Sequence, residues 1–447
     1  MALCFRKLVC FKSSRVKQTV KNCAFYAFRN FLSNAYLSPE LSKQITSPAS
    51  GSGDMAEVCM SLNRCHERNM PVSSMMIDRM IRCVQTDEHL SGSLFYLHHF
   101  RHTENSYYIR PWTAFTFVKK CLEVNPKTLV DILTLKTHYG IFPDVFSLNK
   151  VLDVLLEKQD LKGALDLACQ MFLLEVLDNK TSQALAIEAV SRYWEENTTE
   201  IIPTFEDVTI KRNVAGILYC IGMYLSNPSL TLLGQSLLGS IEAEHGIRAT
   251  YQEPWGPLWW EPGYLENAVS SVENLNEPIS KQSVDILLSL TINNNELHER
   301  AAKTCHTAQE KGLILDEDLF TLKGIAKSLL NNLPKYEAED REVSDKQLWT
   351  WLEDRTTFEE IEKEVLSEYK EKREALSREI RIEKEAHDQA VENLGFWDLA
   401  RDRKVERENP NFYLREDYIE GALEDLVLLE RFRDKRSIVK DPIILVS

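Results

Sequence analysis

The residues best suited to binding chemistry lie between positions 101 and 136. Six basic residues stand there against three acidic ones, and Tyr107, Tyr108 and Trp112 lie among them as platforms on which bases could stack. The basic residues are Arg101, Arg110, Lys119, Lys120, Lys127 and Lys136. For any one of them a solvated helix face is the simpler explanation. As a group they are the best candidate for a nucleic-acid contact, because phosphate contacts dominate the affinity of such complexes.

Catalytic patterns are absent from the sequence. It contains no phosphate-binding loop, no dinucleotide-binding glycine motif, no nucleophile elbow and no His-Glu-x-x-His motif. His98 and His102 have the i, i+4 spacing of metal ligands, but no third ligand is near them, and Leu97 and Phe100 indicate a packed helix. We therefore expect a protein that is not an enzyme and has no cofactor or metal.

The N-terminus has the composition of an import signal. No Asp or Glu occurs before Glu40, and the stretch mixes Ser and apolar residues with seven basic ones. These are Arg6, Lys7, Lys12, Arg15, Lys17, Lys21 and Arg29. Such segments direct proteins to the mitochondrial matrix, so residues 1–45 are expected to be a targeting sequence and 46–55 a linker. A basic arm that binds nucleic acid is the alternative.

Length and composition favour a large helical protein. A chain of 447 residues exceeds one ordinary core, and only 16 Gly and 15 Pro interrupt it. No run of about 18 apolar residues occurs, so no membrane contact is expected. A formal charge of -15 is unfavourable for extensive binding to RNA or DNA.

Helix pairs recur along the first half of the chain. Leu148, Leu152 and Leu155 share one helical face, a second helix follows the turn at "EKQD", and Asp144 is placed to cap the first helix. Similar pairs precede this one at intervals near 35 residues, back to Ser74. A period of this length made of helix pairs predicts a solenoid, in which each pair buries its apolar face against its neighbours.

The unit "GIFPDVFSLNKVLDVLLEKQDLKGALDLACQM" resembles a pentatricopeptide repeat. The resemblance rests on Gly140-x-x-Pro143-Asp144, on Asn149, and on Leu, Ala and Met at the positions that the repeat prefers. Further blocks, "MPVSSMMIDRMI", "FYLHHFRHTENSYYIRPWT" and "WWEPGYLENAV", are similar to the pentatricopeptide-repeat ribosomal proteins of the mitochondrial small subunit. The resemblance implies a non-catalytic component that contacts small-subunit ribosomal RNA and neighbouring ribosomal proteins and supports mitochondrial translation.

The resemblance also implies which residues would read RNA. Pentatricopeptide arrays use side chains of the first helices, here Asp78, Ala114 and Asn149, with Asp144 and Asn179 closing two units. Ala114 has no hydrogen-bonding group, so a complete reading surface is not expected. The candidate RNA-binding residues are Arg101, Arg110, Lys119, Lys120, Lys127, Asn149 and Lys150.

The chain divides by composition into several further regions. We expect pentatricopeptide-like repeats over 56–194, a second helical region over 195–330, an acidic linker at 331–346 and a charged helical region over 347–447. Within the charged C-terminal region, the pattern of residues 353–393 predicts a long solvated helix. Its apolar residues keep a broken heptad, so it could pair with a partner helix. Trp255, Trp259 and Trp260 could anchor a partner, although packing onto the solenoid is the simpler role.

Two other functions fit the same features. A freestanding mitochondrial pentatricopeptide factor for transcript processing or stability would share the repeats and the import signal. A protein-binding helical scaffold would need no RNA contact at all. The fold expected in all three cases is an all-α solenoid of helical hairpins with a long charged C-terminal helix.

Overall fold

The computed structural model describes residues 31–47, 54–67, 72–198, 202–246 and 263–392. Helices make up nearly all regular structure in these ranges, which confirms the all-α prediction. The exception is a pair of two-residue strands, β1 (Ile279–Ser280) and β2 (Ile314–Leu315), which lie parallel. Neither strand falls within the repeats predicted between 74 and 179.

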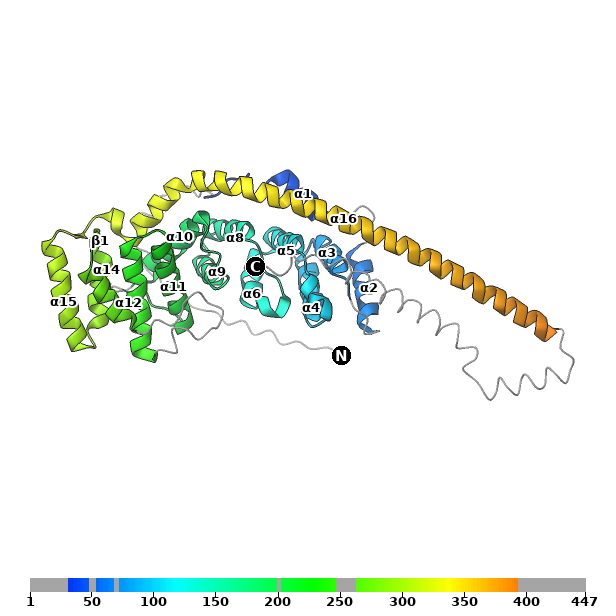
Figure 1. Ribbon diagram of the computed structural model, residues 1–447, viewed down its shortest axis with the longest axis horizontal. Coiled ribbons are helices and arrows are strands. Elements are labelled where there is room, and N and C mark those ends of the chain that lie inside the picture. Colours follow the sequence, from blue (N-terminus) through cyan, green and yellow to red (C-terminus); the bar gives the residue numbers. More distant parts are fainter. Residues whose placement is uncertain (1–30, 48–53, 68–71, 199–201, 247–262, 393–447) are drawn as a thin grey trace, which may run out of the picture.

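Stacked helix pairs form the first half of the molecule (Figure 1). The first helices of successive pairs begin at Ser74, Pro111, Val145 and Lys180, which are 37, 34 and 35 residues apart. This spacing confirms the predicted period of the solenoid. The elements are α2 (Met55–Glu67), α3 (Ser74–Arg82), α4 (Asp87–Arg101), η1 (Glu104–Tyr108), α5 (Pro111–Val124), α6 (Pro126–Thr134), α7 (Lys136–Tyr139), α8 (Val145–Glu157), α9 (Leu161–Leu173) and α10 (Lys180–Asn197).

Side-chain caps separate one pair from the next. Asp144 accepts a hydrogen bond from the backbone N–H of Ser147 at 3.2 Å, as predicted, and Asn179 caps α10 through Ser182 at 3.0 Å. Each cap satisfies an N–H that the first turn of a helix leaves without a partner. Gly140 ends α7 with φ of 68°, a conformation that costs glycine little.

The stack continues through the predicted second helical region (Figure 1). The first two helices of this region pack closely, because a Cβ on Gly234 would lie 2.5 Å from the backbone nitrogen of Tyr219. The elements are α11 (Val208–Tyr224), α12 (Pro228–His245), α13 (Tyr264–Glu273), α14 (Lys281–Thr291), α15 (Asn295–Glu310) and η3 (Asp318–Phe320). Trp255, Trp259 and Trp260 lie outside the described residues.

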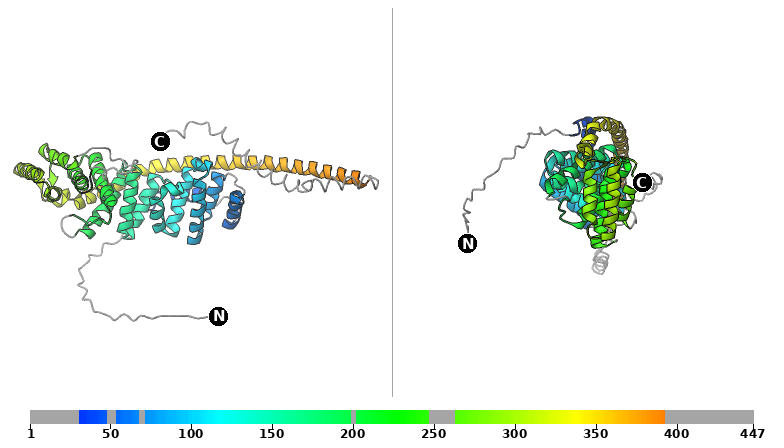
Figure 2. Two further views of the ribbon diagram at one scale, coloured as in Figure 1. Left: turned by 90° about the horizontal axis from the view of Figure 1, so that it is seen from below. Right: turned by 90° about the vertical axis from the view of Figure 1, so that its left-hand side faces the viewer.

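One helix of 71 residues, α16 (Leu322–Glu392), runs back along the whole stack. At 1.5 Å per residue it is about 105 Å long. It starts beside α14, where the backbone N–H of Leu322 donates to Gln282 at 3.2 Å. From there it crosses the repeats and projects beyond α2 (Figures 1 and 2). The predicted long C-terminal helix is confirmed as far as Glu392, and residues 393–447 lie outside the described part.

The predicted linker at 331–346 is wrong, because these residues belong to α16. Leu333, Glu337, Asp340, Ser344 and Leu348 are all buried and recur at helical spacing. Three of the five are polar, so the composition resembles that of a solvated segment. Their partners lie in distant parts of the chain, which explains why they are buried.

Residues 31–47, which we call the strap, also belong to the folded body. They include α1 (Pro39–Thr46), which packs against α16 and α5. Leu32, Tyr36 and Ile45 are at most 1% exposed. The expected targeting segment 1–45 therefore overlaps the folded body over residues 31–45, whereas residues 1–30 lie outside the described part.

We expect Gly234→Ala to lower the free energy of unfolding by about 1–3 kcal/mol, because the added methyl group would be forced against the backbone of α11. Gly92 in α4 is the matched control, since a Cβ there meets nothing within 4 Å. Gly92→Ala should raise the free energy of unfolding by about 0.5–1 kcal/mol. Denaturant titration measures both, and the same sign for both variants would contradict the close packing of α11 on α12.

Candidate nucleic-acid interface

The first helices of the repeats share one long surface, which we call the inner strip. It comprises α3, α5 and α8, which carry the base-reading positions that the resemblance implies, together with α10, the first helix of the next pair. The strap and α16 lie along this surface (Figures 1 and 2). The inner strip is thus occupied by two other segments of the same chain.

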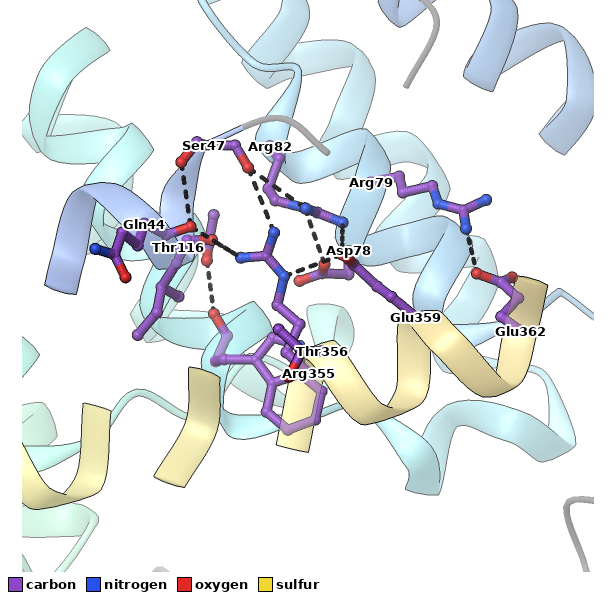
Figure 3. A network of polar contacts seen from close by, with 12 residues as sticks. Gln44, Ser47, Asp78, Arg79, Arg82, Thr116, Arg355, Thr356, Glu359 and Glu362 are labelled. Atoms are coloured by element: carbon purple, nitrogen blue, oxygen red, sulfur yellow. Dashed lines mark hydrogen bonds and ion pairs between the residues drawn. The ribbon is translucent and has the colours of Figure 1, made fainter. Parts of the chain in front are cut away.

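A buried ion network joins α3 to α16 (Figure 3). Arg82 lies with Nε 3.0 Å from Oδ2 of Asp78 and with Nη2 3.1 Å from Oε1 of Glu359. Arg355 reaches the same carboxylate at 3.2 Å. Nearby, Arg79 pairs with Glu362. Since Arg82 and Asp78 are almost completely inaccessible to water, their pairing offsets part of the cost of burying two charges.

The same network holds the strap. Arg355 donates to the carbonyl oxygens of Ile45 and of Gln44, the latter at 3.4 Å. Arg82 and Arg355 both approach the carbonyl of Ser47, at 3.4 and 3.5 Å. These carbonyls lie at the end of α1, where a helix leaves its last acceptors free and favours positive charge. Two arginines therefore fasten α1 to α3 and α16.

Burial and charge act in opposite directions on these groups. Burial raises the pKa of Asp78, although Arg82 and Arg355 oppose this shift. Burial also acts to raise the pKa of Glu359, but the two arginines outweigh it and hold the pKa below its ordinary value of 4.5. Glu359 therefore adds stability above about pH 4.5, which is lost as the pH falls through the lower folded-state pKa.

A second polar chain crosses the strip near its middle. Asn149 donates to the hydroxyl of Tyr36 at 3.0 Å and accepts from the hydroxyl of Ser182 at 2.8 Å. Tyr36 in turn donates to Asp340 of α16 at 2.9 Å, and Asn179 donates to the same carboxylate at 2.7 Å. Asn149 is fully buried, so its amide is satisfied within the protein.

Aromatic contacts close the strip beside the ion network. Trp112 lies 6.1 Å from Phe358 and Phe115 lies 5.8 Å from Trp351, measured between ring centroids. The guanidinium of Arg110 stands over the ring of Phe358 at 4.2 Å, which favours the cation on that face. Arg110 and Trp112 thus contribute to the seating of α16.

The other two reading positions are buried as well. Asp78 accepts from the hydroxyl of Thr113 at 3.1 Å in addition to its ion pair, and Ala114 is 2% exposed. None of the three side chains named by the resemblance reaches solvent in this structure.

The remaining basic candidates lie near the surface but do not form one patch. Lys127 is the most exposed, at 80%, and lies 3.7 Å from Asp160. Lys120 lies 3.8 Å from Glu123 and is 15% exposed. Arg101 is half-buried and donates through Nε to the carbonyl of Thr137 at 3.2 Å.

Two lysines converge on a groove of about 340 Å³ between the strap, α5 and α8. We call it the basic groove; its lining includes Asn34, Leu37, Phe115, Lys119 and Lys150. Burial lowers the pKa of Lys119, while Glu123 acts in the opposite direction. Lys150 donates to Asp153 at 2.9 Å. The groove lies where the strap borders α5 and α8.

The histidine pair at the C-terminal end of α4 is exposed to solvent. The Nε2 atoms of His98 and His102 lie 3.4 Å apart. Among the described residues there is no group of three or more His, Cys, Asp or Glu that could hold a metal ion. No described helix is long and apolar enough to cross a membrane.

Sequence reasoning did not find the residues that close the strip. Tyr36, Asp153 and Asp340 contact partners more than one hundred positions away, so no local pattern marks them. Only the i, i+4 spacing of Asp78 with Arg82 and of Arg355 with Glu359 is visible in the sequence.

These features define a helical repeat protein of stacked hairpins whose inner strip is filled by its own N-terminal strap and C-terminal helix. The model of one protein family, described as mitochondrial 28S ribosomal protein S27, matches residues 4–215. Over these residues the chain is similar to this family of mitochondrial ribosomal proteins. The match spans the strap and the helix pairs through the start of α11.

Replacing Arg355 by Ala should lower the free energy of unfolding by about 3 kcal/mol, because Glu359 and the carbonyls of α1 would lose their shared partner. Arg378, on the exposed part of α16, serves as the control. Arg378→Ala should change the free energy by less than about 0.5 kcal/mol. Equal losses in a denaturant titration would show that the buried network does not hold α16 in place.

Proposed function

We propose that the protein is a non-catalytic, structural component of the mitochondrial small ribosomal subunit. It acts in the matrix, contacts small-subunit ribosomal RNA and neighbouring ribosomal proteins, and supports translation there. The family match over residues 4–215 carries this proposal, and the acid-free, basic N-terminus supports the location.

The filled inner strip favours RNA contact without base reading. A pentatricopeptide array that reads RNA needs exposed polar side chains on its first helices. Here Asp78 and Asn149 are buried and bonded within the protein. The repeats would therefore share the helical architecture of pentatricopeptide arrays without their side chains for base recognition.

Cations outside the closed strip are the proposed RNA contacts. Lys119 and Lys150 line the basic groove, while Lys127 and Arg101 lie at other points of the repeats' surface. Lys120 lies next to Lys119 in the chain and adds to the local positive charge. Such side chains hold phosphates and position a protein on RNA without reading its sequence.

The overall charge limits how far this contact extends. With a formal charge of -15, most of the surface repels a phosphate backbone. A protein that touches RNA at a few cations and other proteins elsewhere satisfies both facts. The same reasoning favours a ribosomal component over a freestanding RNA-binding factor, which would need affinity of its own.

The protein should sediment with the mitochondrial small subunit in a sucrose gradient of organelle lysate. We expect this co-sedimentation because the protein would contact both RNA and neighbouring proteins in the assembled subunit. Sedimentation as a free chain under low-salt conditions, with intact subunits present, would contradict the proposal.

Removing the charges of Lys119 and Lys127 together, as Lys119→Gln with Lys127→Gln, should weaken association with the subunit. Each lost phosphate contact should reduce the salt dependence of binding by a slope of about 1. The control is Lys303→Gln, an exposed lysine on α15. Salt release from purified subunits gives the readout, and identical release of all three proteins would exclude these lysines as contacts.

A further inference from the structure

We propose that the N-terminal 47 residues divide at Phe31 into two parts with different roles. Residues 1–30 carry the import signal, and residues 31–47 remain in the mature protein as the structural strap. This inference rests on the proposed mitochondrial location, and it fixes which peptide bonds a presequence peptidase can cut without damage to the fold.

The positive charge of the N-terminal segment lies before the strap. All seven basic residues of the acid-free stretch lie between Arg6 and Arg29. The strap has one acidic residue, Glu40, and one basic residue, Lys43, so it carries no net charge. The electrostatic attraction to an anionic membrane surface, on which import signals depend, therefore belongs to residues 1–30.

The strap is anchored from its first residue. The backbone N–H groups of Phe31 and Leu32 both donate to Oδ1 of Asp153, at 2.8 and 3.2 Å. Asp153 is fully buried in α8. A carboxylate in this position needs such donors, since an unpaired buried charge is strongly unfavourable.

Further along, the strap supplies partners to α16 and α8. The backbone N–H of Ser33 donates to Glu337 at 3.2 Å, and Tyr36 links Asn149 to Asp340. The carbonyl of Ile45 accepts from Arg355. Glu337, Asp340 and Arg355 are each less than 9% exposed.

Loss of the strap would therefore leave four buried charges short of partners, namely Asp153, Glu337, Asp340 and Arg355. It would also uncover the apolar cluster that Leu41 and Ile45 form with Phe115 and Trp351. Cleavage within the strap would therefore destabilise the fold.

The N-terminus of the protein recovered from mitochondria tests the division directly. Mass spectrometry of the terminal peptide should find a first residue at or before Phe31. A mature chain that begins downstream of Phe31 would overturn the proposal.

Full-length chains with a C-terminal fluorescent protein test the location of the signal. The variant Arg15→Gln, Lys17→Gln, Lys21→Gln should lose most mitochondrial import, whereas Lys43→Gln should be imported like the wild type. If the wild type itself stays outside mitochondria, the proposed function fails. If the wild type is imported and the triple variant is imported equally well, the division at Phe31 fails.

Stability measurements test the proposed structural role of the strap. A chain starting at Phe31 should unfold at the temperature of the full-length protein, and one that also lacks the strap should unfold about 5 °C or more below it. Tyr36→Phe, which removes one hydroxyl from the full chain, should lower the midpoint by a smaller amount. Unchanged midpoints for both the strapless chain and Tyr36→Phe would contradict a structural role.

Discussion

The pairing of Arg82 and Arg355 with Glu359 is the interaction on which the arrangement of the molecule depends. It joins three segments that are far apart in the chain, namely α3, the end of the strap and the middle of α16. Charges buried in this way are stable only with all their partners in place. The repeats, the strap and the long helix must consequently fold as one unit, even though a stack of repeats by itself needs contacts only between neighbours.

This constraint decides what the repeats can bind. The surface that would face RNA in a pentatricopeptide array faces α16 and the strap instead. The carboxylates of Asp340, Glu359 and Glu362 lie against Asn179, Arg82 and Arg79, where an RNA strand would place its own acceptors. The position of α16 on the strip thus explains why its buried face carries carboxylates.

Much of the fold could be predicted because its signals are local. The spacing of Leu148, Leu152 and Leu155 marks a helix within a few turns, and Asp144 and Asn179 cap helices that begin at the next residue. The long C-terminal helix was predictable from its mixed charges and heptad remnants. These features depend on residues close together in the chain, which a sequence displays directly.

The filling of the strip could not be predicted, because its partners are remote. Glu337 and Asp340 have the composition of a linker and are buried only because Ser33, Tyr36 and Asn179 meet them. The resemblance placed Asn149 on an RNA-reading face, and the structure shows its amide bonded to the strap. The basic candidates were predicted by residue type, but their separation into groove and surface positions depends on the path of the strap.

A density map of the assembled mitochondrial small subunit tests the central claim most directly, because it shows what lies against the inner strip. The account predicts that residues 337–362 of α16 and the strap cover α3, α5, α8 and α10, with ribosomal RNA outside them. Nucleotides stacked against Asp78 and Asn149, with α16 displaced, would contradict it.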